Sequence, residues 1–142
     1  MNAVKIYKDA DQLINGLAHY IVKRGQAAVQ KHGRFNFVLS GGNSPKMLYE
    51  MLASEAFRDE IDWANWYFFF GDERFVPEDD ARKNFNMVND ALFKPMEISQ
   101  SHIFKIKTDQ TPELSAKDYN DALKQYFAND KVVFDFVLLG LG

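Results

Sequence analysis

The sequence has no cysteine, only four prolines among 142 residues, and no apolar run that approaches the length of a membrane span. Without cysteine the protein can form no disulfide, use no thiol nucleophile and hold no metal through thiolates. The N-terminus lacks the apolar core of a signal peptide, so we expect a cytoplasmic protein with no membrane partner. With a formal net charge of −3, the chain also lacks the positive excess that is typical of proteins that bind nucleic acid.

Apolar and aromatic residues, by contrast, are abundant. Hydrophobic residues make up 46% of the sequence and include 13 Phe and 6 Tyr, while 26% of the residues are charged. This balance is typical of a globular domain rather than of a disordered chain. The length suits one domain with a sizeable core, so we expect residues 1–142 to form a single domain with an aromatic interior.

Short strand-like apolar runs alternate with segments of helical period. Strands are expected at residues 4–7, 35–39, 66–70, 103–106 and 134–139. Helices are expected from Asp9 or Asp11 to Gly33, from Ser44 to about Ser54, from near Lys83 to Pro95, and around 119–127. The alternation predicts an α/β fold, a Rossmann-like, open and mostly parallel sheet with helices on both faces.

The stretch from Ser40 to Pro45 joins a predicted strand to the helix that follows it. Gly41 and Gly42 allow positive φ and a close approach of the backbone to a ligand. Ser44 can cap the helix, and Pro45 suits its first turn. The free N–H groups and the positive end of the helix dipole would then face an anion above the turn. An ordinary turn that binds nothing is the alternative.

Two further predicted strands end in unusual turns. Asp72, Glu73 and Arg74 follow one of them, and Gly140-Leu141-Gly142 follows the last. In open parallel sheets, ligands bind beyond the carboxyl ends of the strands, so three such turns on one edge indicate a binding site. Arg74 would hold a phosphate or carboxylate through paired hydrogen bonds. The alternative is a solvated loop in which Arg74 pairs with a neighbouring carboxylate.

Several segments together resemble the 6-phosphogluconolactonases, within the wider family that also contains glucosamine-6-phosphate deaminases. The segments are Ser40-Gly41-Gly42-Asn43-Ser44-Pro45, Ile61-Asp62-Trp63, Phe69-Phe70-Gly71-Asp72-Glu73-Arg74-Phe75-Val76-Pro77 and Leu138-Leu139-Gly140-Leu141-Gly142. The resemblance covers the whole chain in order and spacing, and the pattern Gly-Asp-Glu-Arg-x-Val-Pro is its most specific part. Deaminases are similar at the Ser-Gly-Gly turn but typically have Asp-Glu-Tyr in place of Asp-Glu-Arg.

The resemblance implies hydrolysis of the ring ester of 6-phospho-D-glucono-1,5-lactone to 6-phosphogluconate, a step of the pentose phosphate pathway. It implies a small-molecule sugar phosphate as partner, no cofactor and no metal. Arg74 would meet substrate or transition-state charge, and Asp72 would orient polar groups. The residues implied in substrate or phosphate binding are Ser40, Gly41, Gly42, Asn43, Ser44, Glu73, Asn84, Gly140 and Gly142. One departure lies beside Asn84, because Lys83 precedes it where lactonases usually have serine.

A second departure concerns the general base. In the family, the turn that corresponds to Gly140-Leu141-Gly142 continues into Asp-Gly-His, and that histidine is the presumed base. It is therefore expected beyond Gly142, and His19, His32 and His102 lack its context. We thus expect the N-terminal portion of a lactonase, truncated after a central strand. With that apolar strand uncovered, the 142 residues alone should lack lactonase activity and should not form a stable monomer.

Two alternatives to a lactonase remain open at this stage. An isomerase or deaminase acting on an amino sugar phosphate would use Asp72 as its proton-transferring carboxylate, although Arg74 argues against this. A non-catalytic fragment that only binds sugar phosphates is the other. The sequence predicts neither the order of the strands in the sheet nor the oligomeric state.

Overall fold

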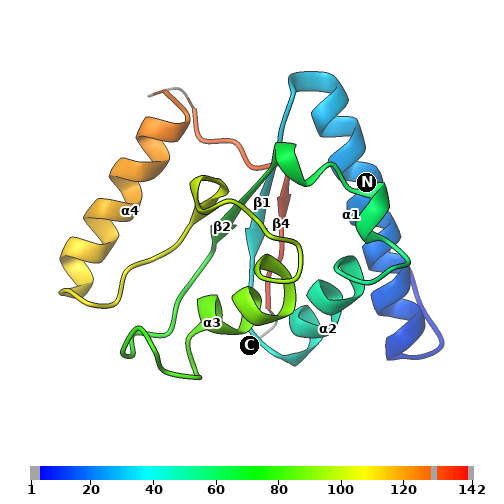
Figure 1. The fold of residues 1–142 in the computed structure, drawn as a ribbon, viewed down its shortest axis with the longest axis horizontal. Helices are drawn as coiled ribbons and strands as arrows, with labels where there is room; N and C mark the ends of the chain where they lie inside the picture. The colour runs from blue at the N-terminus through cyan, green and yellow to red at the C-terminus, as the bar shows by residue number, and fades with distance from the viewer. Residues whose placement is uncertain (1–3, 129–130, 141–142) are drawn as a thin grey trace.

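Parallel strands form one sheet in the order β3-β2-β1-β4 (Figure 1). The computed structural model describes residues 4–128 and 131–140, and its strands are β1 (Phe35–Leu39), β2 (Trp66–Phe70), β3 (Ile103–Phe104) and β4 (Phe136–Val137). β1 and β2 pair along their whole length, with Phe37 opposite Phe68. Along its other edge, β1 pairs with β4, and Phe37 lies opposite Phe136.

Helices cover both faces of the sheet (Figure 1). The core residues place α1 (Ala10–His32), α2 (Asn43–Leu52) and α3 (Asn84–Val88) on one face and α4 (Pro112–Tyr126) on the other. The connections contain η1 (Arg58–Glu60), η2 (Trp63–Asn65), η4 (Gln100–His102) and a π-helical turn, η3 (Asn89–Phe93), that continues α3. The predicted open α/β sheet is therefore confirmed. No helix in the described part of the chain is both long and apolar enough to cross a membrane.

The alternation of side chains along the strands divides the core into two layers. Phe35, Phe37 and Leu39 belong to the layer under α1, α2 and α3, whereas Val38 packs with Phe69 in the layer under α4. Aromatic rings pack against one another in the first layer, where the ring centroids of Trp66 and Phe35 lie 4.5 Å apart. Both layers close against β1 and β2, which makes these two strands the rigid support for the loops that follow them.

The ends of α1 follow the sequence, whereas the start of α2 does not. Asp9 caps α1 by accepting the N–H of Gln12 at 2.9 Å, and Gly33 ends it with φ of 82°. α2 begins at Asn43 with Gly42 in the N-cap position, so Ser44 lies inside the helix. The prediction of a Ser44 cap is wrong, because Gly42 adopts φ of 103°, which glycine tolerates and which turns the chain into the helix before Ser44.

The outer strands are shorter than the sequence predicts. Residues 4–7 form no strand, and Val4 and Ile6 are exposed. Strand β3 ends at Phe104 rather than 106, and β4 covers only two residues of the predicted 134–139. Among the described residues, β4 is an edge strand and not the buried central strand that its apolar sequence predicts. Its Val137 and the following Leu139 are 44% and 84% exposed.

Candidate active site at the carboxyl ends of the strands

The strand order places a topological switch point between β1 and β4. From β1 the chain goes to β2 on one side of it, and β4 later pairs with its other side. In open parallel sheets, the crevice beyond the carboxyl ends of two such strands is where ligands bind. Ser40-Gly41-Gly42 follows β1 and Gly140 follows β4, so two of the predicted turns flank this crevice. Gly142, also predicted here, lies outside the described residues.

The N-terminus of α2 points its unpaired backbone groups toward the same edge. α2 has ten residues, and no described side chain caps it. Asn43 and Ser44, the first two residues of the helix, are exposed at this end. A helix start whose N–H groups have no internal acceptor attracts an anion through those groups and through the helix dipole. This geometry agrees with the anion site that the Ser40–Pro45 stretch predicts, although the cap is Gly42.

A buried tyrosine from α2 holds the end of β1. The hydroxyl of Tyr49 donates to the Ser40 carbonyl at 2.7 Å and accepts the Ser40 N–H at 2.9 Å. Burial raises the pKa of Tyr49, an effect only partly offset by its hydrogen bond to the Ser40 backbone, so the hydroxyl remains a donor. Sequence reasoning missed this residue, because a tyrosine in an apolar stripe is usually a core residue.

The same hydroxyl separates β1 from β4. The Val38 carbonyl accepts the Leu138 N–H at 3.0 Å, which is the last bond of the β1–β4 ladder toward the carboxyl edge. Ser40 lies two residues further along and directs its backbone groups to the same side. Because Tyr49 occupies both groups, the ladder cannot continue past Leu138, and the crevice at the switch point stays open.

A second tyrosine holds the end of β2 in the same way, from the opposite face. The hydroxyl of Tyr119 in α4 donates to the Phe70 carbonyl and accepts the Phe70 N–H, both at 2.9 Å. Burial raises the pKa of Tyr119 to about 12, against the opposing effect of its hydrogen bond to Phe70. At the carboxyl edge, these two hydroxyl groups thus satisfy backbone N–H and carbonyl groups that a neighbouring strand satisfies elsewhere in the sheet.

Glu73 connects the loop after β2 to the start of α3. Its Oε1 accepts the N–H of Asn84 at 2.6 Å and that of Arg74 at 2.7 Å, and its Oε2 accepts the N–H of Phe85 at 3.0 Å. The carboxylate therefore caps the short α3 from eleven residues away in the sequence. A direct contact of Glu73 with substrate stays a prediction, while its observed contacts are with the backbone.

Asn84 joins the turn after β1 to the loop after β2. It is 6% exposed, and its Nδ2 donates to the Asp72 carbonyl at 3.3 Å. A Cβ on Gly41 would lie 2.0 Å from Oδ1 of Asn84, so the amide packs directly on the glycine backbone. Gly41 must therefore be glycine because of this close approach, and not because of its φ.

The side chains of the two residues predicted to be catalytic have no polar partner among the described residues. Asp72 and Arg74 are both exposed, and neither side chain forms a hydrogen bond or salt bridge with another described residue. The ion pair that would make Arg74 an ordinary surface residue is thus absent from residues 4–128 and 131–140. Both side chains are free to meet a ligand above the turns.

Comparisons with known proteins show the family of the chain. A family model described as glucosamine-6-phosphate isomerases/6-phosphogluconolactonase matches residues 8–142. The chain belongs to this family. Its relatives include the 6-phosphogluconolactonase of Treponema pallidum (strain Nichols), which is 32% identical over 139 residues, covering 96% of this chain and 56% of the relative. The 6-phosphogluconolactonase of Haemophilus influenzae is 35% identical over 104 residues, or 73% of this chain and 44% of the relative.

Solved structures show the same fold. A crystal structure of a devB protein superposes with a TM-score of 0.84 at 32% identity, over 97% of this chain and 57% of that one. The 6-phosphogluconolactonase of Trypanosoma cruzi gives a TM-score of 0.83 at 29% identity, over 96% of this chain and 57% of that chain. The chain therefore spans about half the length of the relatives it matches.

No histidine of this family member contacts the turns at the carboxyl edge. The ring of His19 packs 4.7 Å from Phe57, and that of His102 stacks 4.3 Å from Tyr67, measured between centroids. Nε2 of His32 lies 2.9 Å from Oδ1 of Asp135 at the amino end of β1, a hydrogen bond that the sequence did not indicate. All three histidines lie in the described residues. Within these residues there is also no cluster of three or more His, Asp or Glu suited to a metal.

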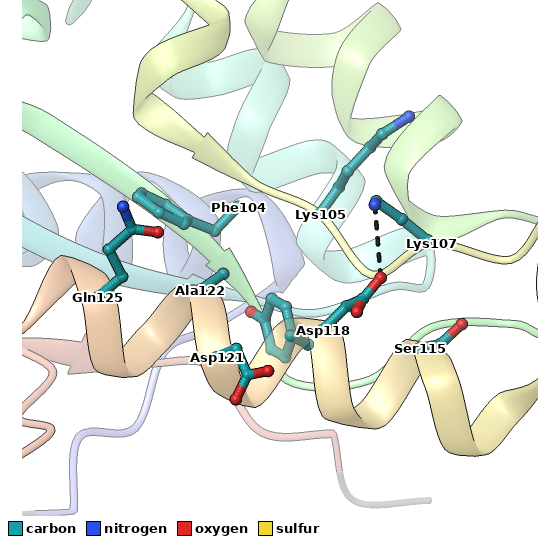
Figure 2. Close-up of a pocket in the computed structure, with 9 residues that line it drawn as sticks. Phe104, Lys105, Lys107, Ser115, Asp118, Asp121, Ala122 and Gln125 are labelled. Atoms are coloured by element: carbon teal, nitrogen blue, oxygen red, sulfur yellow. Dashed lines mark hydrogen bonds and ion pairs between the residues drawn. The ribbon is translucent and has the colours of Figure 1, made fainter.

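One cavity lies away from the predicted residues. It has a volume of about 340 Å³ and opens between β3 and α4, with Phe104, Lys107 and Asp118 among its lining residues (Figure 2). Lys107 and Asp118 point toward each other across it, 3.5 Å apart. None of the residues that the sequence assigned to the site lines this cavity. The candidate site is thus formed by the turns and the helix end, not by this hollow.

Proposed function

We propose that this chain forms the sugar-phosphate-binding part of a site that hydrolyses 6-phospho-D-glucono-1,5-lactone to 6-phosphogluconate in the pentose phosphate pathway. The observation that carries the proposal is the start of α2 at the switch point, which no described side chain caps, together with the exposed Arg74 in the loop after the neighbouring strand β2. The names of the relatives support the same activity. We further propose that the protein acts on this small molecule in the cytoplasm, without a nucleic acid or membrane partner.

In the proposed site, the N–H groups at the start of α2 bind the phosphate of the lactone. Water adds to the lactone carbonyl carbon, and the carbonyl oxygen takes up negative charge in the tetrahedral intermediate. The Arg74 guanidinium stabilises that charge, because a cation aimed at a developing oxyanion lowers the barrier. The bond to the ring oxygen then breaks, and that oxygen takes a proton to become a hydroxyl group. Asp72 orients the polar groups around the reacting centre.

The base that takes the proton from water is not assigned to residues 4–128 or 131–140. The resemblance implies a histidine as this base, and the three histidines of this chain contact other parts of the structure. We therefore expect the 142 residues alone to bind 6-phosphogluconate but to hydrolyse the lactone at close to its spontaneous rate. Added imidazole should supply a base and raise this rate above that of imidazole without protein.

Binding of 6-phosphogluconate, measured by calorimetric titration, tests the anion site. Gly42→Val should weaken binding by at least about tenfold, because valine strains the backbone of the turn that directs the helix start at the ligand. Gly33→Val is the matched control, since both glycines have positive φ, of 103° and 82°, and Gly33 lies at the far end of α1. Equal affinities of the two folded variants, or no binding by the wild type, would refute the proposed site.

Product analysis separates the lactonase from the deaminase activity of the same family. Incubation with glucosamine 6-phosphate should release no ammonia, whereas lactone incubated with protein and imidazole should yield 6-phosphogluconate. Release of ammonia would overturn the choice of reaction while leaving the anion site intact. Full turnover of the lactone without imidazole would instead show that the base lies among residues 1–142.

A further inference from the structure

Lys83 is a fully buried lysine immediately before Asn84. Its side chain is 0% exposed, and its Nζ lies 2.5 Å from Oε1 of Glu78. Nζ makes no hydrogen bond of good geometry to any described residue, so this ion pair is its polar contact within residues 4–128 and 131–140. An ammonium group removed from water requires a counter-charge, and removing that counter-charge is strongly destabilising. Glu78 therefore fixes where Lys83 can lie.

Glu78 is in turn held by a second segment of the chain. Its Oε1 accepts the N–H of Thr108 at 2.8 Å and the hydroxyl of Thr108 at 3.0 Å, and its Oε2 accepts Nζ of Lys105 at 3.2 Å. Burial raises the pKa of Glu78, but the contacts with Lys83, Thr108 and Lys105 outweigh burial and lower that pKa to about 2. The carboxylate stays charged and anchors the segment before α3 to the segment after β3.

The anchored segment leads directly into the candidate site. Asn84 follows Lys83, and its amide lies on Gly41 and donates to the Asp72 carbonyl at 3.3 Å. On its other side, the Asn84 N–H is held by Glu73 at 2.6 Å. The position of the Asn84 amide is thus fixed by Glu73 through the backbone and by the preceding lysine through its buried side chain.

We propose that Lys83 is a positioning residue for the anion site. Paired with Glu78, it holds Asn84 against Gly41 and so sets the turn that directs the start of α2 at the ligand. Neither Lys83 nor Glu78 touches the ligand in this arrangement. The expected effect of Lys83 on ligand affinity rests on the proposed function, because that function makes a sugar phosphate the ligand at this turn.

Titration with 6-phosphogluconate tests the inference at the level of affinity. Lys83→Met keeps an unbranched side chain of similar length and leaves Glu78 bonded to Thr108 and Lys105. It should raise Kd by about tenfold in a chain that is still folded, because a small displacement of a positioning contact is costly. Lys105→Met is the comparison variant, since it removes a cation from the same carboxylate and leaves Lys83 in place. It also removes the contact of Nζ with the Phe85 ring, 5.0 Å from the ring centroid, and its Kd should stay within about twofold.

A double-variant comparison separates positioning from general weakening. If Lys83 acts through Asn84, then Asn84→Ala and Asn84→Ala/Lys83→Met should have equal Kd values. A further loss of affinity in the double variant, or a wild-type Kd in Lys83→Met, would overturn the inference. Should Lys83→Met fail to fold, Glu78→Leu/Lys83→Met removes both charges together and takes its place in the same comparison.

An NMR measurement without ligand distinguishes failure of this inference from failure of the proposed function. In ¹H–¹⁵N spectra, Lys83→Met should shift the Gly41 backbone amide and the Asn84 side-chain amide, and Lys105→Met should leave both in place. Unshifted resonances in Lys83→Met would refute the positioning role even if 6-phosphogluconate binds. Shifted resonances in a protein that binds no 6-phosphogluconate would support the positioning role and refute the proposed ligand.

Discussion

Gly41→Ala tests the contact that connects the turn after β1 to the loop after β2. The added Cβ would lie 2.0 Å from Oδ1 and 2.6 Å from Cγ of Asn84, far inside van der Waals contact. The Asn84 amide must therefore move, and this breaks its 3.3 Å hydrogen bond to the Asp72 carbonyl. Its backbone cannot follow easily, because Glu73 holds the Asn84 N–H at 2.6 Å.

The loss of stability caused by Gly41→Ala has two contributions, a steric clash and a broken hydrogen bond. Forcing an extra methyl group into a packed contact typically costs about 1–3 kcal/mol, and losing one hydrogen bond about 1 kcal/mol. Because the amide can rotate away from part of the clash, we expect the free energy of unfolding to fall by roughly 1–3 kcal/mol. For a chain of this size that corresponds to a Tm lower by roughly 2–12 °C.

Urea unfolding and thermal melts of four proteins measure the effect: wild type, Gly41→Ala, Asn84→Ala and the double variant. In the Asn84→Ala background the clashing atoms are gone, so Gly41→Ala should cost little, and the coupling should reach at least about 1 kcal/mol. Gly140→Ala, which has nothing within 4 Å of its added Cβ, is the control and should stay within about 0.5 kcal/mol of wild type. Equal stability of Gly41→Ala and Gly140→Ala, or purely additive losses, would refute the contact.

Three further outcomes are expected. With imidazole as the base, Arg74→Lys should lower kcat/KM for the lactone at least about tenfold, because lysine cannot make paired hydrogen bonds. A change under about twofold in steady-state kinetics would mean that Arg74 is only a surface charge. Tyr49→Phe should lower the free energy of unfolding by about 1–3 kcal/mol in urea, since the partly buried N–H and carbonyl of Ser40 lose their partner. An unchanged urea midpoint would contradict this. Because folding lowers the pKa of Glu78 from 4.5 to about 2, its carboxylate stabilises the protein above about pH 4.5 and that contribution is lost as the pH falls toward 2. The stability gap between wild type and Glu78→Gln should therefore shrink in acid melts over this range, and a gap independent of pH would exclude the pair.

The central strands and the longest helix follow from local sequence signals. A continuous apolar run defines β2, and a short run that only Asn36 interrupts defines β1. Asp9 sets the start of α1 through its side chain, and Gly33 sets its end through its backbone. These features depend on neighbours in the sequence, so a single chain is sufficient to predict them. The same holds for the turn at Ser40, whose glycines indicate a special backbone before any tertiary contact is known.

The features that the sequence did not predict depend on distant contacts. An apolar strand sequence reports burial but not which strands flank it, and among the described residues β4 lies at the edge of the sheet. Because side-chain caps are common, the sequence favours Ser44 as the helix cap, whereas the positive φ of Gly42 makes that glycine the N-cap. The carboxylate of Glu73 finds its partners eleven residues away in α3, and no local pattern indicates that pairing.

The hydroxyl groups of Tyr49 and Tyr119 have a consequence for how parts of the molecule can open. The backbone amides of Ser40 and Phe70 are protected by side chains, whereas those within β1 and β2 are protected by neighbouring strands. Releasing a side chain exposes one amide, while opening a central strand requires much of the sheet to separate. We therefore expect the turns at the carboxyl edge to open locally at a lower free energy than the strands beneath them, which stay paired.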